Sequence, residues 1–444
     1  MRQSGSVNSD DRFFFPGEVI YHKCDEGWLA ICIEAANWIV LTSDLQRQIL
    51  EDLTKGSTIG HILEYLSSDE IIQLQKLLAA ITAREFARTD KAPKLHLLEG
   101  NKLLNCYLTN ACNLRCEHCF MSSGVRLKNE LSTDEWNRVL SEFRNCGGES
   151  VTFSGGEPMM RPDLQQIVMN AHNINLNTTI LTNGILWTDR QIHQLSPYIT
   201  EVQVSIDGFD EMSNAKIRGE GNFNKLINTV VAFANEGVQT SVATTFTFAN
   251  LCDNADKRYK QMVEDIKSRC DNPVFFKLSK KVLQGRNTHY SEEENKAFYN
   301  RILEIECAVD PNAQLENFME GHTPNLVTRN CGFGGISIGA DGEVYYCNRI
   351  SEVESYGNIR NLPIKHFMSL GHELHQRTSV DHLVPCKNCY LRNICFGGCR
   401  IDDCSCKGKV KDLKGNIIQN KCNKEFKQRL IRRMIESYFY YYTF

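Results

Sequence analysis

Six short apolar runs alternate with helical segments between about residues 103 and 282, and this alternation constrains the fold more than any other feature. A repeat of strand and then helix predicts a parallel sheet that its helices cover. The strands that we predict are LLNCYLT, SVTFSGG, NLNTTILTNG, EVQVSIDG, VQTSVATTFT and VFFKLSKKV. We therefore predict an α/β fold built on a partial (β/α)6, TIM-like barrel. In such barrels the functional residues lie at the C-terminal ends of the strands.

Changes in composition and in the pattern of apolar residues divide the chain into five parts. We predict an N-terminal module at 1–90, the barrel at 100–290, a bridging segment at 291–330, a cysteine-rich domain at 331–425 and a C-terminal helix at 426–444. The N-terminal module reads as three strands and then three helices, with Ser43 and Ser68 as helix N-caps. This order predicts an α+β module of winged-helix type.

The overall charge and hydropathy exclude two classes of partner. The chain carries 50 Lys and Arg against 54 Asp and Glu, a net charge of -4, so it lacks the basic field that binds a phosphate backbone. The N-terminus, MRQSGSVNSDDRFFFPGE, has no apolar signal-peptide core, and no run of about 18 apolar residues occurs. We expect a cytoplasmic protein with neither nucleic acid nor a membrane as partner.

Nineteen cysteines are too many to be incidental in such a chain. A reducing cytosol keeps thiols free, and the odd number argues against a disulfide framework. The cysteines are also unevenly spread, and nine crowd the C-terminal quarter. Metal ions or clusters are therefore indicated, with a separate metal-rich module near the C-terminus.

The stretch LTNACNLRCEHCF places Cys112, Cys116 and Cys119 directly after the first barrel strand. Three cysteines at these spacings can hold zinc, form disulfides, lie buried and inert, or hold a redox cluster. Three thiolates do not close a tetrahedral zinc site, whereas an iron-sulfur cube can leave one iron open for substrate. The count disfavours a closed zinc site and leaves the other readings open.

The trio and the later strand ends together resemble the radical S-adenosylmethionine (radical SAM) enzymes. The second strand ends in SGGEP, the third in TNG and the fourth in SIDG, Arg218 follows, and VLQGRN comes after the sixth strand. The resemblance implies that the three thiolates hold a 4Fe-4S cluster. Its open iron would bind the amino and carboxylate groups of S-adenosylmethionine, which is reduced and cleaved to a 5′-deoxyadenosyl radical.

The same resemblance implies a set of cofactor contacts. Residues of the strand-end motifs are expected to contact the methionine end and the ribose of S-adenosylmethionine. They are Gly155, Gly156, Glu157, Pro158, Asn183 and Ser205. Glycines there leave backbone amide and carbonyl groups free for the cofactor. Asp207 would structure its strand end, and Arg218 would pair with the cofactor carboxylate. His118 stands where the family usually has another aromatic residue near the adenine. No catalytic residue is predicted.

A second cysteine set resembles the SPASM domain, an extension that carries auxiliary iron-sulfur clusters. It comprises Cys331, Cys347, Cys386, Cys389, Cys395, Cys399 and Cys422. Zinc is the alternative for these pairs in isolation. The resemblance implies two auxiliary clusters, both of the 4Fe-4S type, with 386, 389, 395 and 422 on the outer one and 331, 347 and 399 on the inner one.

One ligand of the inner cluster is absent from its usual place, because HTPNLVTRN before Cys331 contains no cysteine. Cys307, Cys404 or Cys406 could replace it. Otherwise the inner cluster has an open iron, is smaller, or takes a different side chain. The remaining cysteines have no ligand spacing and are predicted to be packed or incidental thiols: 24, 32, 106, 146, 252 and 270.

The N-terminal module resembles the PqqD-like element that binds the leader of ribosomally made precursor peptides. The leader would add as a strand to an exposed sheet edge, with its apolar side chains in a groove against the helices. A DNA-binding winged helix is disfavoured, because residues 1–90 carry 8 Lys and Arg against 14 Asp and Glu. A purely structural cap on the barrel is the other alternative.

These resemblances predict a radical SAM/SPASM oxidoreductase that matures a ribosomally synthesised precursor peptide. It would remove a hydrogen atom from the peptide and install a thioether or carbon-carbon cross-link, with flavodoxin or ferredoxin as electron donor. The alternatives are an enzyme like the anaerobic sulfatase maturases, which makes formylglycine, and a non-catalytic iron-sulfur protein that binds leaders or carries electrons.

Overall fold

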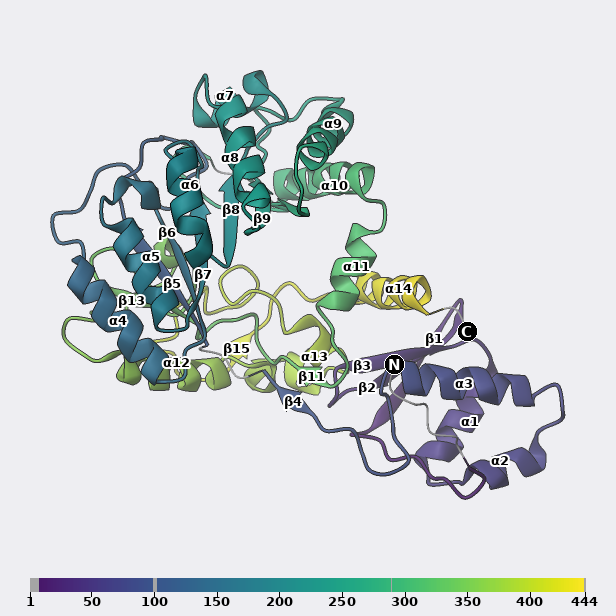
Figure 1. Cartoon of the computed structure of the whole chain (residues 1–444). Helices are drawn as coiled ribbons and strands as arrows, with labels where there is room; N and C mark the ends of the chain where they lie inside the picture. Colours follow the sequence, from purple (N-terminus) through teal and green to yellow (C-terminus); the bar gives the residue numbers. More distant parts are fainter. Residues whose placement is uncertain (1–7, 99–101, 289, 443–444) are drawn as a thin grey trace.

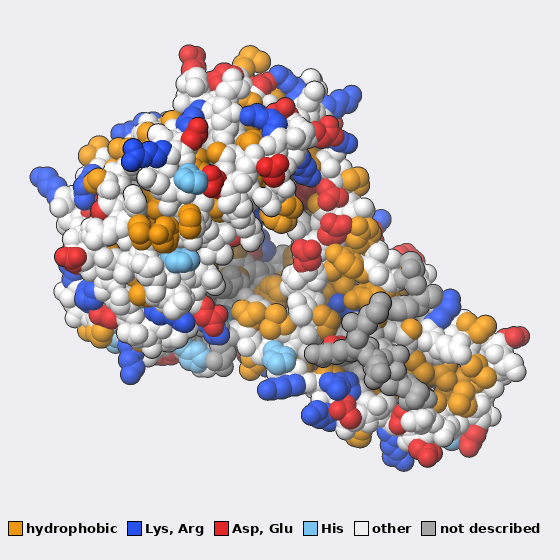
Figure 2. Space-filling model, in the orientation of Figure 1, with side chains coloured by type: hydrophobic (Ala, Val, Ile, Leu, Met, Phe, Trp, Pro, Cys, Tyr) orange, Lys and Arg blue, Asp and Glu red, His pale blue; other side chains and the backbone are white. Residues whose placement is uncertain are grey.

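The computed structural model describes residues 8–98, 102–288 and 290–442. Figure 1 shows the helix-covered sheet at one end of the molecule and the N-terminal module at the other, with the cysteine-rich region below the sheet and reaching toward the module. Hydrophobic side chains are exposed over the module, as Figure 2 shows, and those of Leu63, Tyr65 and Ile72 are among them.

The central sheet contains all six predicted parallel strands, in consecutive order. They are β5 (Leu103–Thr109), β6 (Ser150–Gly155), β7 (Asn177–Thr182), β8 (Glu201–Ser205), β9 (Gln239–Thr244) and β10 (Val274–Leu278). The predicted helices between them are α4 (Thr133–Asn145), α5 (Leu164–Asn173), α6 (Asp189–Leu195), α8 (Phe223–Asn235) and α9 (Ala255–Ser268), and α7 (Glu211–Arg218) is an addition after β8. The mixed α/β fold with a parallel sheet is thus confirmed.

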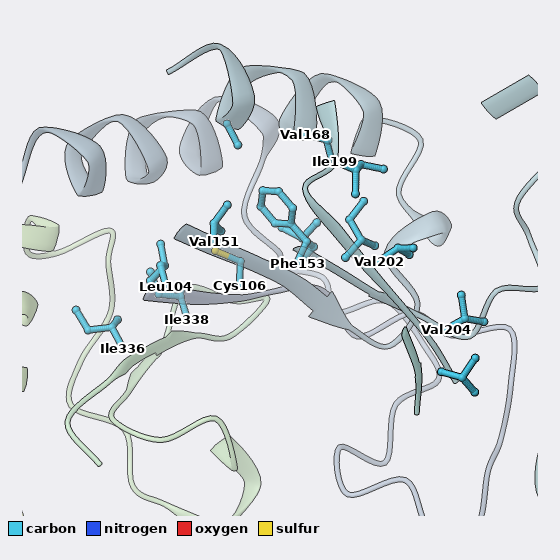
Figure 3. Packing of buried hydrophobic residues seen from close by; sticks show 14 of the residues in the cluster. Leu104, Cys106, Val151, Phe153, Val168, Ile199, Val202, Val204, Ile336 and Ile338 are labelled. Atoms are coloured by element: carbon cyan, nitrogen blue, oxygen red, sulfur yellow. The ribbon is translucent and has the colours of Figure 1, made fainter. Parts of the chain in front are cut away.

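Two short strands of the cysteine-rich region extend this sheet beyond β5. They are β12 (Ile336–Ile338), parallel to β5, and β13 (Val344–Tyr345), antiparallel to β12. Figure 3 shows Ile336 and Ile338 beside Leu104 and Cys106, the residues with which they are in register. The cysteine-rich region therefore shares a sheet and a hydrophobic core with the barrel. A three-residue strand between glycines has no periodicity that would predict this pairing.

The N-terminal module has the predicted order of strands and helices. Its antiparallel sheet consists of β1 (Val19–Cys24), β2 (Gly27–Cys32) and β3 (Asn37–Leu41), followed by α1 (Asp44–Thr54), α2 (Ile59–Tyr65) and α3 (Ile71–Ala83). Ser43 caps α1 as predicted, since its hydroxyl accepts a hydrogen bond from the Gln46 amide. The predicted cap at Ser68 is wrong. The turn before α3 is instead closed by the amide and hydroxyl of Ser67, which both donate to the Glu70 carboxylate.

The C-terminal helix, α14 (Lys424–Tyr441), completes the core of the N-terminal module. The indole of Trp38, on β3, is fully buried and donates a hydrogen bond of 3.1 Å to the Met434 carbonyl. Figure 1 shows α14 beside α11 (Ala313–Glu320) and close to the three strands. Every residue of β3 is buried, whereas β1 is half-buried along most of its length. The exposed edge of this sheet is therefore β1.

Smaller elements complete the bridging and cysteine-rich parts. They are β4 (His96–Leu97), α10 (Glu292–Val309), β11 (Leu326–Val327), α12 (Ile364–Arg377), β14 (Leu383–Val384), α13 (Arg392–Cys395) and β15 (Ile417–Ile418). In the three described ranges, no helix has the length and hydropathy needed to cross a membrane.

A bidentate ion pair fastens α4 of the barrel to the cysteine-rich region. Arg360 Nε and Nη2 donate to the two carboxylate oxygens of Glu135 at 2.6 and 3.1 Å. The hydrogen bond from Arg360 lowers the pKa of Glu135 to about 2. The two side chains are about one-third exposed, so solvent screens the contribution of this ion pair to the free energy of unfolding.

We expect Glu135→Gln to lower the free energy of unfolding by about 1 kcal/mol at pH 7. Because the folded pKa lies below the unfolded one, this stabilisation is present above about pH 4.5 and is lost as the pH falls toward 2. Urea unfolding at pH 7 and at several acidic pH values measures the difference from wild type, which should shrink with acidity. Asp134→Asn, in the same helical turn and with the same change of charge, is the control. An equal loss in both variants would contradict the role of the ion pair.

Candidate functional site

Cys112, Cys116 and Cys119 lie in the loop that follows β5, at the C-terminal rim of the parallel sheet. The loop is closed by backbone hydrogen bonds from Cys112 to Gly124 and from Gly124 to Asn110. Burial raises the pKa of the Cys112 and Cys116 thiols, and the neighbouring thiolates add to the rise. The three sulfur atoms are thus close enough for their charges to interact.

The SGGEP turn packs directly against this loop. A Cβ atom on Gly156 would lie 2.1 Å from the Ala111 carbonyl oxygen, and one on Gly155, whose φ is +134°, would lie 2.4 Å from that of Thr109. The amides of Gly156 and Glu157 donate to the same two carbonyls at 2.7 and 2.8 Å. The Gly156 amide is therefore used within the protein and is not free for a cofactor, whereas cofactor contacts through the carbonyl groups of this turn stay a prediction.

Glu157 links the ends of three neighbouring strands. It is fully buried, and burial raises its pKa. Its carboxylate accepts hydrogen bonds of 2.7 Å from the Thr182 hydroxyl and from the Asn183 amide. The Asn183 side chain in turn donates to Asn113 of the cysteine loop at 2.8 Å. Glu157 therefore acts as a positioning residue. Beside it, Pro158 is buried at the start of a short 3-10 turn.

Asp207 joins the rim to both Arg218 and His118. Its Oδ2 atom lies 2.7 Å from Arg218 Nη2 and 3.3 Å from His118 Nε2, and its Oδ1 atom accepts from the Thr245 amide at 2.7 Å. The Arg218 contact is an ion pair without hydrogen-bond alignment. In the structure Arg218 thus has a protein carboxylate as partner, which sequence reasoning had not assigned.

Two buried nitrogen atoms of this group lack a hydrogen-bond partner among the described residues. They are Nε of Arg218 and Nδ1 of His118, whose side chains are 9% and 14% exposed. The Arg218 charge also reaches the thiols of Cys116 and Cys112, where it opposes the effect of burial on their pKa. A carboxylate ligand beside the cysteine loop would satisfy this guanidinium. The donor set therefore fits a cofactor with a carboxylate and a cluster on three thiolates.

The remaining strand ends close the rim. Ser205 is half-buried at the end of β8. After β10, a Cβ atom on Gly285 would lie 2.5 Å from the His118 backbone, and the Asn287 amide donates to Glu117 at 2.9 Å. Sequence reasoning missed Glu130, which accepts hydrogen bonds from the Thr109 hydroxyl and the Asn110 amide and so fixes the start of the loop. Its spacing carries no signal that could have revealed this role.

The C-terminal cysteines fall into two groups. One group consists of Cys386, Cys389, Cys395 and Cys422. Burial is the main cause that raises the pKa of the Cys386, Cys395 and Cys422 thiols, and the charges of other thiolates in the group raise it further. The other group consists of Cys331, Cys347 and Cys399. Burial raises the pKa of the Cys347 and Cys399 thiols, and the charge of Cys331 raises both further. The outer and inner ligand sets implied by the resemblance have their members in these two groups and stay a prediction. Cys307 is exposed on α10 and accepts a hydrogen bond from Gln314.

No three Cys, His, Asp or Glu side chains in the described ranges converge tightly enough to hold a single metal ion. A tetrahedral zinc site with bonds of about 2.3 Å would need sulfur atoms within about 4 Å of one another. In an iron-sulfur cube each thiolate binds a different iron, so the sulfur atoms stand farther apart. An iron-sulfur cube therefore requires a wider spacing of its thiolates than a single zinc ion does.

Comparisons with known proteins agree with the geometry of the rim. Residues 106–265 match the model of the radical SAM superfamily. The sporulation killing factor maturation protein SkfB of Bacillus subtilis is 26% identical over 313 residues, which cover 68% of each chain. The AdoMet-dependent heme synthase of Nitratidesulfovibrio vulgaris is 26% identical over 331 residues, covering 67% of this chain and 87% of the relative.

Among solved structures, Streptococcus suis SuiB bound to the precursor peptide SuiA is similar in fold. The TM-score is 0.51 at 16% identity, with 87% of this chain and 95% of SuiB covered.

Proposed function

This chain contains a radical SAM domain, and from that premise we propose that it is a maturase that cross-links a ribosomally synthesised precursor peptide. The observation that carries the proposal is the cysteine trio at the sheet rim, bonded to SGGEP and flanked by the Asp207–Arg218 pair. The radical SAM domain implies a 4Fe-4S cluster and S-adenosylmethionine. Bound together under reductant, they supply a radical that removes a hydrogen atom from an unactivated carbon.

The residues of the rim would hold and orient these groups. Cys112, Cys116 and Cys119 would bind the cluster. Arg218, held by Asp207, would offer its unpaired Nε to the cofactor carboxylate. Glu157 and Asn183 would keep the SGGEP turn against the cysteine loop. We assign adenine contact to His118 and ribose contact to Ser205 as proposals that rest on their positions at the rim.

Two observations support a peptide substrate. The SkfB relative is named as a maturation protein. A tetrapyrrole substrate, which the heme synthase relative would suggest, gives the N-terminal module no role. A cavity of about 220 Å³ lies between β3, α3 and the end of α14. Leu77, Ala80 and Tyr438 give it an apolar lining, and Thr42 and Lys76 add polar groups. We propose that an apolar leader side chain enters this cavity and that a separate stretch of the leader adds as a strand at β1, the opposite edge of the sheet.

Two auxiliary 4Fe-4S clusters belong to the same proposal. The outer one would use Cys386, Cys389, Cys395 and Cys422, and the inner one Cys331, Cys347 and Cys399. Their role would be to accept the electron that the product radical loses when the cross-link closes, and flavodoxin or ferredoxin would supply the electron that starts the reaction.

Anaerobic co-expression with the short open reading frames beside the gene tests the function. A cross-link removes two hydrogen atoms, so the modified peptide should lose their mass, and fragment spectra should show a closed ring. A peptide aldehyde at a Cys or Ser would instead support the sulfatase-maturase alternative. Reconstituted protein that fails to cleave S-adenosylmethionine under reductant would support the non-catalytic alternative.

The leader cavity gives a separate prediction. Ala80→Leu should fill part of the cavity and weaken binding of the fluorescently labelled leader half of that peptide by about tenfold, roughly 1.4 kcal/mol. Fluorescence anisotropy measures the affinity, and circular dichroism checks the fold. The matched control is Ala79→Leu, because Ala79 is the exposed neighbour on α3. Equal affinity in the two variants would place the leader elsewhere.

A further inference from the structure

Strand β10 is the last strand at one edge of the central sheet. It pairs with β9 in parallel, and no strand in the described ranges pairs with its other side. Just after β10, the Ser279 amide donates to the Thr244 carbonyl on β9 at 2.9 Å, so the alternate amides of Phe276 and Leu278 face away from β9. Neither of these two amides has a hydrogen-bond partner among the described residues.

Few of the usual devices protect this edge from another strand. The register of β10 with β9 is continuous, so no bulge twists the edge away, and the sequence VFFKL contains no proline. Its single lysine, Lys277, pairs with Glu201 at 3.1 Å. Beside it, Phe275 is 53% exposed. The edge therefore offers both free backbone donors and apolar surface to an incoming strand.

A cavity of about 420 Å³ lies along this edge. All five residues of β10 contribute to its lining, and the C-terminal end of α10 and the helix α11 contribute the rest of one wall. The hydroxyl of Tyr440, on α14, donates to Glu316 of α11 at 2.5 Å and so helps to hold α11 in place. The volume lies within the range of binding clefts, about 300–1,000 Å³.

The lining of the cavity carries a net negative charge. Its acidic residues are Glu201, Glu306, Asp310, Glu316 and Glu320, and its basic residues are Lys267 and Lys277. Lys277 neutralises Glu201, and Lys280 pairs with Glu306 at 2.9 Å. The other three carboxylates form no ion pair with a described residue, and Lys267 alone is left in the described lining to offset them. Figure 2 shows acidic side chains on the surface around the position of α11.

The C-terminal end of β10 leads to the cysteine loop. The segment after it packs against this loop, since Gly285 lies against the His118 backbone and the Asn287 amide donates to Glu117 at 2.9 Å. Five residues of strand span about 17 Å. A peptide laid along β10 would therefore run from the acidic cavity toward the rim of the candidate site.

We propose that the outer edge of β10 binds an extended, basic stretch of the precursor peptide by strand addition. The backbone of this stretch accepts hydrogen bonds from the Phe276 and Leu278 amides, and its lysines or arginines face the three unpaired carboxylates. The residues next to this stretch thereby reach the rim. The inference rests on the proposed function, to which it adds a charge class for the substrate and a docking strand on the barrel.

Fluorescence anisotropy with labelled peptides tests the docking on the full, reconstituted chain. The probe alternates lysine with threonine, and a second peptide has glutamate in place of lysine. At low ionic strength the lysine probe should bind, and the glutamate peptide should bind at least about tenfold more weakly. A lysine probe with methylated backbone nitrogens keeps its charge but cannot pair as a strand, so it should also lose at least about tenfold in affinity.

Two pairs of variants locate the site. Phe276→Pro removes an amide that faces away from β9, where an edge strand tolerates proline. Phe276→Ala removes the same ring and keeps the amide, so only the proline variant should lose the probe, while circular dichroism checks both folds. Glu320→Lys should weaken binding by about fivefold. Its control is Glu293→Lys, at the other end of α10 and outside the lining, which should bind as wild type does.

Equal binding of the lysine and glutamate peptides, of the methylated and unmethylated probes, or in the two Phe276 variants overturns the docking. So does a wild-type dimer that Phe276→Pro dissociates in analytical ultracentrifugation, because a second copy would then occupy the edge. Probe binding needs neither cleavage of S-adenosylmethionine nor a cross-linked product, so failure of the proposed function shows separately, as an unmodified precursor in the co-expression assay. Where wild type does modify the precursor, Phe276→Pro should lower the cross-linked fraction while 5′-deoxyadenosine still forms. An undiminished cross-linked fraction overturns the role of the edge.

Discussion

Replacing Cys116 with alanine is expected to abolish reductive cleavage of S-adenosylmethionine. The variant keeps two of the three thiolates, and two thiolates cannot hold three corners of a 4Fe-4S cube. No cysteine between Cys119 and Cys146 could replace the lost ligand. Cys116 also lies close enough to Arg218 and Asp207 for their charges to act on its thiol. Its replacement therefore removes the cluster ligand beside this ion pair. The reconstituted protein should form no 5′-deoxyadenosine above the level of buffer, as measured by chromatography after reduction with dithionite.

Cys106→Ala is the matched control for this result. Cys106 lies on β5, only ten positions before Cys116, and it is fully buried in the sheet core. Its replacement removes a packed sulfur and should cost about 1 kcal/mol of stability while cleavage continues. Cleavage that persists in Cys116→Ala, or that stops in Cys106→Ala, would contradict the division into ligand and packing cysteines.

The sequence predicted the barrel well because its signals are local. Each of the six strands is a short apolar run, and residues 103–109 were delimited as the structure has them. The motif residues then follow from topology, since parallel strands bring their C-terminal ends to one rim. SGGEP and the cysteine loop are neighbours for this reason, although about forty residues separate them in the chain.

Contacts that depend on side-chain packing could not be predicted in this way. The indole of Trp38 bonds to a carbonyl 396 positions later, so the place of α14 against the N-terminal module has no local signal. Pairing of Arg218 with Asp207 depends on α7, a helix that was not predicted from the sequence. The Ser68 cap failed for a related reason, because Ser67 and Glu70 formed a competing turn one residue earlier.

These packing contacts give the rim its charge balance. The cysteine loop collects negative charge when its thiols are deprotonated, and Arg218 is the buried cation beside it. Arg400, which follows Cys399, is also buried, but its side chain donates to backbone carbonyls and forms no ion pair with a carboxylate in the part of the chain that the structure describes. The first site therefore keeps a protein anion, Asp207, that pairs with its arginine, whereas Arg400 is held by backbone carbonyls.

Asp207→Asn should therefore have a large effect on both stability and cofactor binding. The ion pair with Arg218 is buried, and removal of one charge leaves the other uncompensated, at a cost of about 3–5 kcal/mol. Arg218 would also lose the partner that fixes it, so affinity for S-adenosylmethionine should fall at least about tenfold. Urea unfolding measures the first effect, and equilibrium dialysis of the reconstituted protein measures the second.

The control for this variant is Asp210→Asn, three residues further along the same segment. Asp210 caps α7 through the Ser213 amide and contacts Arg258 at a more exposed position, so its loss should cost only about 1 kcal/mol. Cofactor affinity should stay unchanged there. If both variants bind S-adenosylmethionine equally well, Asp207 stabilises the strand end without positioning Arg218. If affinity falls in Asp207→Asn alone, Arg218 reaches the cofactor only while Asp207 holds it.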